Sequence, residues 1–303
     1  MQIPLSKEAT QAGPWYLKSL PRNATRRILR GTPRAPLFHA LNQRVDHAAP
    51  RTVSTFHDLF VMTGEYSTAE FRARFAAQAR GAAERSDMII AVSQFTARQV
   101  EELLGVNASR IRVIPHGTRI VASSGVARQN LILTVGAIQK RKNIARLVKA
   151  FERTPLGWRL AIAGAPGGYG ADTELLAVER SSRRRDIDVL GYVPAAELDA
   201  LYERAGIFAF PSLDEGFGMP VLDAMAHGVP VLASRRSAIP EVAGEAAWFV
   251  DPENQDEISA ALVDLAADPT RREDLARRGR DRAALFTWPA AVDQTWAVYE
   301  SLT

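Results

Sequence analysis

The sequence contains no cysteine, so disulfide bonds and thiolate metal sites are excluded. This absence is typical of proteins in a reducing compartment, and we expect a cytoplasmic protein. There is also no run of eighteen or more apolar residues, and residues 1–5 lack the long apolar core of a signal peptide. We therefore expect a soluble chain that stays where it is made.

A large excess of charge of one sign is absent too, since the formal net charge is +4 over 303 residues. The basic residues nevertheless crowd the N-terminal portion: Lys18, Arg22, Arg26, Arg27, Arg30, Arg34 and Arg44. The simpler interpretation is a solvated leader. The alternative is attraction to a polyanionic acceptor or to anionic lipids, which would give peripheral contact at the cytoplasmic face of the membrane. No aromatic-basic interleaving or recognised motif accompanies this charge, so we expect no nucleic-acid partner.

The first part of the chain alternates strands with helices. Apolar runs predict strands at 37–41, 52–57, 87–92 and 111–115, and amphipathic patterns predict helices at 71–85 and 94–104, the second with Ser93 as N-cap. Residues 1–35 are irregular, with one expected helix around 15–29. Strands that alternate with helices indicate parallel βαβ units, so this part is half of a doubly wound domain.

Residues 117–129 are small and polar without periodicity, and we interpret them as an interdomain linker. The alternation then restarts. Strands are predicted at 130–135, 158–163, 187–190, 207–210, 229–233 and 246–250, and helices at 144–153, 171–183, 196–204, 255–267, 269–285 and 289–302. With 47% apolar residues, the chain can build two cores. We predict an α/β protein with domains at 1–117 and 118–285 and a C-terminal segment at 286–303.

The most informative stretch is 208–228, an apolar strand followed by a glycine-containing loop and a short apolar helix. Such a strand-loop-helix places backbone N–H groups and the positive end of a helix at the carboxyl edge of a sheet, where anionic nucleotides bind in open α/β folds. Glu215 lies in the loop, and Asp223 follows about two helical turns later. A glycine-containing turn with one acid would by itself be more often structural than catalytic.

The whole stretch resembles the donor-binding signature of retaining glycosyltransferases of the GT-B fold, family 4, also described as glycosyl transferases group 1, and bacterial mannosyltransferases in particular. Two acids separated by seven residues mark that signature, and Glu215 and Asp223 have this spacing, although the second acid of the family is usually Glu. The resemblance runs from about residue 37 to the end. It implies two Rossmann-like, doubly wound parallel-sheet domains facing a cleft, with a last helix, carrying Trp296 and Tyr299, that returns to the N-terminal domain.

A second motif follows the strand at 130–135. Gly136 lets the backbone approach a ligand, and the basic residues at 140–142 offer charge to a diphosphate. The resemblance implies that Lys142, by its place before Asn143, binds the nucleotide diphosphate. Ala137 occupies a position that is basic in many members, so one phosphate contact is either absent here or supplied by Lys140 or Arg141.

Other segments are similar to the family with less specific consequences. Residues 190–194 resemble a turn that contacts the nucleobase, which implies Tyr192 and Val193 in donor binding. Residues 161–168 are glycine-rich but lack the Gly-Lys-Ser/Thr end of a P-loop, and we interpret them as a structural turn. Residues 113–117 match the hinge of the family, with Arg119 where Asp is common. Residues 237–242 and 249–252 also match and are interpreted as packing and turn features.

The resemblance to bacterial mannosyl- and rhamnosyltransferase-like members implies that His57 touches the donor sugar from the N-terminal domain, with Asp58 as a structural neighbour. No metal is expected, because no His, Asp and Glu residues have convincing ligand spacing. The Asp-x-Asp triplet 186–188 is interpreted as a solvated strand start paired with the arginines at 183–185. A lysine and a helix N-terminus would neutralise the diphosphate instead.

The resemblance therefore implies a metal-independent, retaining hexosyltransferase without a cofactor, in polysaccharide or glycoconjugate biosynthesis. Its donor would be a nucleotide diphosphate sugar, GDP-mannose rather than a UDP-sugar, and its acceptor a glycan or lipid-linked molecule. The expected catalytic residues are His57, Lys142 and Glu215. The expected donor-binding residues are Gly136, Lys142, Tyr192, Val193, Glu215, Gly216, Phe217, Gly218, Met219 and Asp223.

One departure from the family leaves alternatives open. The hinge near Gly117 comes several tens of residues early, so the N-terminal domain is shortened and its first βα unit has no counterpart. The sheet would have an exposed edge, covered by homo- or hetero-association, unless the true start lies upstream. The rival hypotheses are a donor-binding but catalytically impaired partner subunit and a sugar-nucleotide epimerase of the same fold.

Overall fold

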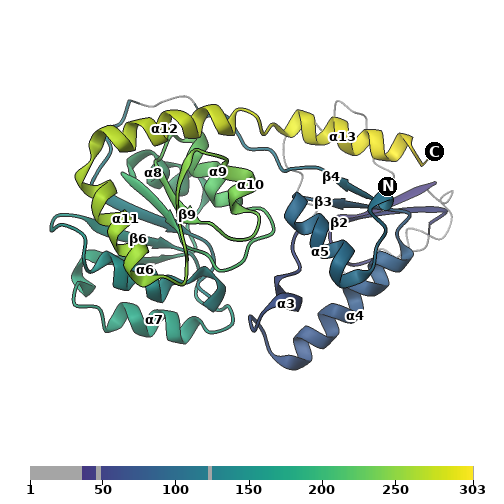
Figure 1. Cartoon of the computed structure of the whole chain (residues 1–303), viewed down its shortest axis with the longest axis horizontal. Helices are drawn as coiled ribbons and strands as arrows, with labels where there is room; N and C mark the ends of the chain where they lie inside the picture. The colour runs from purple at the N-terminus through teal and green to yellow at the C-terminus, as the bar shows by residue number, and fades with distance from the viewer. Residues whose placement is uncertain (1–35, 46–48, 122–124, 303) are drawn as a thin grey trace.

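A computed structural model of the chain describes residues 36–45, 49–121 and 125–302. The helix expected around 15–29, and the N-terminal basic residues other than Arg44, lie outside these ranges. The described residues form two α/β domains side by side, and the last helix extends from the C-terminal domain over the N-terminal one (Figure 1). No helix within the described ranges has both the length and the apolar character needed to cross a membrane.

The N-terminal domain contains one parallel sheet with the strand order β1-β2-β3-β4. Its strands are β1 (Leu37–Ala40), β2 (Arg51–Phe56), β3 (Met88–Ala91) and β4 (Ile111–Val113), and its helices are α3 (Phe60–Thr63), α4 (Ala69–Arg85) and α5 (Gln94–Leu104). Ser93 caps α5, because its hydroxyl accepts a hydrogen bond from the N–H of Thr96. The predicted strands, both longer helices and this cap are confirmed, whereas the short α3 was not expected.

Alternating residues of this sheet pack against different helices. Phe56 and Ile89 lie in the core beneath α4 and α5, whereas Val53 of the same strand as Phe56, and Ile90 next to Ile89, face α13 (Trp288–Glu300). This is the two-residue period of a strand that is buried on both faces. The last helix therefore packs on the N-terminal sheet and contributes to the core of that domain (Figure 1).

The C-terminal domain contains a six-stranded parallel sheet in the order β10-β9-β8-β5-β6-β7. The strands are β5 (Leu131–Val135), β6 (Arg159–Ala163), β7 (Ile187–Gly191), β8 (Ile207–Phe210), β9 (Val231–Ser234) and β10 (Ala247–Val250). This is the doubly wound Rossmann order, and its direction reverses between β5 and β8. Ligands of such sheets bind at the carboxyl ends of the strands beside that switch point.

Helices cover both faces of the larger sheet. They are α6 (Ile144–Phe151), α7 (Ala171–Glu179), α8 (Ala195–Arg204), α9 (Met219–Ala226), α10 (Ile239–Ala243), α11 (Gln255–Ala267) and α12 (Pro269–Ala283). Strand β8 shows why, since Phe208 and Phe210 enter one core while Ile207 and Ala209 enter the other. Each fully buried large side chain contributes about 1.5–3 kcal/mol.

Two local predictions for this domain were partly wrong. The helix predicted to reach residue 183 ends at Glu179, because Ser181 and Ser182 instead donate to the carboxylate of Glu152 and the backbone turns there. Asp186 pairs with Arg183 at 2.9 Å, as expected. Asp188 pairs with Arg159 of the neighbouring strand, at 2.8 Å, rather than with the arginines before it.

Candidate functional site

The switch point brings together the loop after β5 and the loop after β8. Lys142 comes from the first loop and Glu215 from the second, and Nζ of Lys142 lies 2.6 Å from Oε1 of Glu215. Both residues are buried, with 8% and 7% of their surfaces exposed. The two residues that the sequence places 73 positions apart therefore form one buried ion pair.

Glu215 has further polar partners in the same place. Arg141 contacts Oε2 at 2.7 Å, and the hydroxyl of Ser212 donates to Oε1 at 2.6 Å. Burial acts to raise the pKa of Glu215, but the charges of Lys142 and Arg141 outweigh it, and the pKa lies below its ordinary value. Burial lowers the pKa of Lys142, and the adjacent carboxylate offsets part of that effect. The carboxylate is thus held ionised between two cations.

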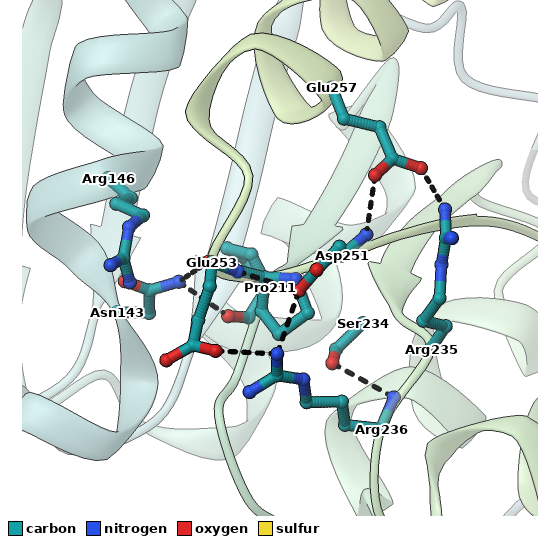
Figure 2. A network of polar contacts seen from close by, with 10 residues as sticks. Asn143, Arg146, Pro211, Ser234, Arg235, Arg236, Asp251, Glu253 and Glu257 are labelled. Atoms are coloured by element: carbon teal, nitrogen blue, oxygen red, sulfur yellow. Dashed lines mark hydrogen bonds and ion pairs between the residues drawn. The ribbon is translucent and has the colours of Figure 1, made fainter.

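Asn143 fixes the position of the lysine beside it. Its backbone is left-handed, with φ of 60°, where a short 3₁₀ turn at residues 140–142 passes into α6. Its side-chain NH₂ group donates to the carbonyls of Pro211, at 2.9 Å, and Pro252, at 2.7 Å (Figure 2). One amide therefore ties the loop of Lys142 to the ends of β8 and β10.

A charged network supports the same region from the loops after β9 and β10. Arg236 contacts Asp251 at 3.1 Å and Glu253 at 2.6 Å, and Glu257 accepts from the N–H of Asp251 (Figure 2). Ser237, which follows Arg236 in the chain, accepts a hydrogen bond from the N–H of Glu215 at 3.0 Å. Residues 237–242 and 249–252, expected as packing and turn features, thus hold the backbone of the candidate site.

Gly136 leaves the space that Lys142 occupies. Its φ is 137°, and a Cβ atom there would lie 2.9 Å from Cε of Lys142. In the neighbouring glycine-rich turn, a Cβ at Gly164 would lie 1.9 Å from the carbonyl oxygen of Gly136. The glycine of that turn therefore serves close backbone packing, which agrees with its structural interpretation.

His57 approaches the loop of Glu215 from the N-terminal domain. A Cβ at Gly216 would lie 1.8 Å from the carbonyl oxygen of His57, so the backbones of the two domains touch here. The His57 Nε2–H donates to the carbonyl of Leu41 at 2.8 Å, and Nδ1 of His57 lies 3.2 Å from Nε2 of His116. Burial, and to a lesser degree His57, lowers the pKa of His116 to about 4.

The N-terminus of α5 also contacts that loop. The hydroxyls of Ser93 and Thr96 donate to the carbonyl of Gly216, at 2.6 and 3.0 Å. The chain ahead of the loop is held as well, because Thr63 of α3 donates to the Asp214 carboxylate at 2.9 Å. The short, unexpected α3 thus serves an interdomain contact.

Several functional candidates were not recognised from the sequence. Ser212 and Asp214 lie inside the glycine-rich stretch, so proximity to Glu215 was their available signal. Asp58, predicted to be structural, is mostly buried beside Gly216, and burial raises its pKa to about 6. Ser93 and Thr96 carried only the signal of a helix cap, which does not reveal a partner in another domain.

Other predicted donor-binding residues lie apart from the ion pair. Oδ1 of Asp223 accepts from the hydroxyl of Thr118 in the linker at 2.8 Å, and burial raises the pKa of Asp223. Arg119, where the family often has Asp, pairs with Asp199. Tyr192 is 81% exposed just beyond β7.

The remaining predicted donor residues border the loop of Glu215 or the core. Gly218 precedes α9 with φ of 100°, and Met219 begins that helix. Phe217 packs edge-to-face on His116, with 5.1 Å between ring centroids. Val193 packs against the core of the C-terminal domain. Within the described ranges, no group of three or more His, Asp or Glu side chains could hold a metal.

Two Rossmann-like domains that meet at a basic, glycine-rich switch-point site form the architecture of the GT-B fold. The family model described as glycosyl transferases group 1 matches residues 119–282, and the model described as glycosyltransferase family 4 matches residues 14–120. The chain belongs to this family of glycosyltransferases.

Comparison with individual proteins agrees. O-antigen chain mannosyltransferase B of Escherichia coli is 32% identical over 287 residues, which cover 88% of this chain and 74% of that protein. MMP alpha-(1->4)-mannosyltransferase of Mycolicibacterium hassiacum is 32% identical over 223 residues, 70% of this chain but only 53% of that protein.

Two solved structures show the same fold. Sucrose-phosphate synthase from Thermosynechococcus elongatus matches with a TM-score of 0.75 at 22% identity, over 88% of this chain and 73% of that one. Anabaena HepE in complex with UDP-glucose matches with a TM-score of 0.71 at 19% identity, over 83% of this chain and 72% of that one.

Proposed function

We propose that the chain is a retaining, metal-independent mannosyltransferase that uses GDP-mannose and transfers to a glycan or lipid-linked acceptor. The observation that carries this proposal is the buried Lys142–Glu215 pair at the switch point, opposite His57. The names of the two mannosyltransferase relatives support mannose as the sugar.

The leaving diphosphate would be stabilised by Lys142 and by the start of α9. An ammonium has three N–H donors, and Glu215 and the ring of Phe210, 4.5 Å from Nζ, leave room for another acceptor. Pro220 has no N–H and the N–H of Val221 donates to the carbonyl of Gly218 at 2.9 Å, so the start of α9 would contribute the N–H of Met219 and the positive end of a helix. Charge that develops on the diphosphate in the transition state would thus meet fixed positive groups, which is the main source of rate enhancement in such a site.

Glu215 would position the sugar rather than exchange protons. It is held ionised by two cations, so it accepts hydrogen bonds, and sugar hydroxyls would donate to its remaining lone pairs. His57 has both ring nitrogens engaged, so it would orient the sugar as a fixed wall of the site. The acceptor oxygen would bond to the anomeric carbon on the face from which the diphosphate leaves, and the departing phosphate oxygen would take the acceptor's proton, so the configuration is retained. Holding the sugar in this orientation lowers the entropic part of the barrier.

A donor screen tests the proposal. GDP- and UDP-sugars would be incubated with wild type, Glu215→Gln and, as a control, Glu245→Gln, an exposed acid of the following loop. We expect turnover of GDP-mannose with EDTA present, loss of at least 100-fold in Glu215→Gln and little change in the control. NMR of the product would show the retained α-anomer.

Other outcomes of the screen separate the rival functions. A donor that binds without turnover on any acceptor would indicate a catalytically impaired partner subunit. A new sugar nucleotide formed from donor alone would indicate an epimerase. If no nucleotide sugar binds, the proposal is wrong.

A further inference from the structure

A cavity of about 640 Å³ lies between the N-terminal sheet and α13. Its walls are the carboxyl ends of the four strands of that sheet and one side of α13, including Trp288 and Trp296. His57 and Met219 line it at the end that adjoins the loop of Glu215. Its size is within the range of small-molecule sites in proteins, and it lies beside the candidate donor site.

The lining of this cavity carries no permanent charge. None of its described lining residues is Asp, Glu, Lys or Arg. The half-buried imidazoles of His39 and His116 are neutral near pH 7, because desolvation lowers the pKa of each to about 4. A nucleotide diphosphate or an ionised sugar would find no counter-charge here, so a charged occupant is disfavoured.

The imidazole and hydroxyl groups in the walls already have hydrogen-bond partners within the protein. His39 contacts the hydroxyl of Tyr299 at 2.5 Å through Nδ1 and that of Thr55 at 2.8 Å through Nε2. The hydroxyl of Thr295 donates to the carbonyl of Ala291 at 2.8 Å. Satisfied pairs of this kind offer few hydrogen bonds to a bound sugar ring, whose hydroxyls would lose their water without replacement.

The remaining wall is aliphatic and aromatic. Leu41, Ile90 and Ile114 from the sheet face Val292 and the two tryptophans of α13. We propose that this cavity binds the hydrocarbon chain of the acceptor, an alkyl or isoprenoid group, while the hydroxyl that attacks the sugar lies at the end next to His57 and Met219. The inference rests on the proposed transferase function and narrows its acceptor to a lipid-linked one.

The inference is tested by the ratio of the KM values for two acceptors that differ only in their alkyl chain. Methyl and octyl α-mannoside carry the same sugar, and the octyl compound would be used below its critical micelle concentration. We expect wild type to have a KM at least tenfold lower for octyl mannoside, because each buried methylene contributes about 0.8 kcal/mol. Val292→Trp, which fills the cavity, should bring the KM ratio to about one. Ala290→Trp adds a tryptophan to the exposed side of the same helix and should keep the wild-type ratio.

Two further measurements keep the test decisive if Val292→Trp is unstable or if no transfer occurs. Trp296→Ala widens the cavity and should shift the preference from octyl to dodecyl mannoside. Calorimetry should show octyl mannoside binding to wild type with a negative heat-capacity change, and no binding of methyl mannoside. Such binding without transfer would support the cavity and count against the transferase. Transfer with equal KM for the two mannosides would overturn the inference, and so would an octyl preference that Val292→Trp keeps. It would also be overturned if residues 1–35 or a second chain were found to occupy this cavity.

Discussion

Glu241 of the C-terminal domain caps the helix that begins at Gln94 of the N-terminal domain. Its carboxylate accepts the backbone N–H groups of Gln94, at 2.7 Å, and Phe95, at 3.1 Å. These are the orphan donors at the positive end of α5, and a carboxylate satisfies them in both charge and hydrogen bonding. Because Ser93 and Thr96 of the same turn hold Gly216, this helix end connects the two domains directly beside Glu215.

Removing that carboxylate should loosen the junction between the domains. We expect Glu241→Ala to cost about 1 kcal/mol, the usual effect of losing a helix cap. The amides of residues 94 and 95 should then exchange their hydrogens about fivefold faster, as measured by hydrogen-deuterium exchange. Glu245→Ala, at an exposed acid four residues on, is the control and should leave these amides protected. Unchanged exchange in Glu241→Ala would mean that the cap does not hold the domains.

The two sides of the buried ion pair should differ in their effect on stability. Glu215→Gln leaves Lys142 and Arg141 buried without their shared carboxylate, and we expect a loss of about 3–5 kcal/mol in the free energy of unfolding. Lys142→Met should cost less, because Arg141 and Ser212 still satisfy Glu215. Urea unfolding of both variants measures the difference. A larger cost for Lys142→Met would show that Arg141 is not an effective partner.

Gly136→Ala should disturb catalysis more than folding. The added Cβ would lie 2.9 Å from Cε of Lys142 and would displace the ammonium from the place proposed for the diphosphate. We expect kcat/KM for the donor to fall on the order of 100-fold. Gly105→Ala is a control for an added Cβ at a positive φ, 67° at Gly105 against 137° at Gly136, because nothing lies within 4 Å of that Cβ. It should lose about 1 kcal/mol of stability and keep its activity. Equal activity of the two variants would contradict the placement of Lys142.

What the sequence itself predicts is that Lys142 and Glu215 each follow an apolar strand. Their common place at one edge of the sheet followed from the resemblance to the family, because the sequence does not show that β5 and β8 are neighbours. The contacts between the domains could not be predicted from the sequence. Glu241 meets the start of α5 only because of the way in which two separately folded sheets pack against each other. Asp223 illustrates the same limit. Its spacing from Glu215 follows the family, but its carboxylate is bonded to Thr118 of the linker.

Asp58 has a mostly buried carboxyl group beside Gly216, in the loop of Glu215. Burial raises the pKa of Asp58 to about 6, although Arg141 acts in the opposite direction. In the unfolded chain the pKa is about 3.9. Between these two values the folded protein keeps a proton that the unfolded chain has released, so the contribution of Asp58 to the free energy of unfolding falls as the pH rises.

Asp58→Asn should remove this pH dependence, because an amide resembles the protonated acid and stays neutral. The quantity to compare is the free energy of unfolding of the variant minus that of wild type. We expect this difference to be about 2–3 kcal/mol larger at pH 8 than at pH 4, since one pKa unit corresponds to about 1.4 kcal/mol. Urea unfolding of both proteins at pH 4, 5, 6, 7 and 8 would follow the change, which should be complete just above pH 6. A difference between variant and wild type that is the same at pH 4 and pH 8 would show that the carboxyl group of Asp58 is hydrated, and that the junction between the domains admits water beside Gly216.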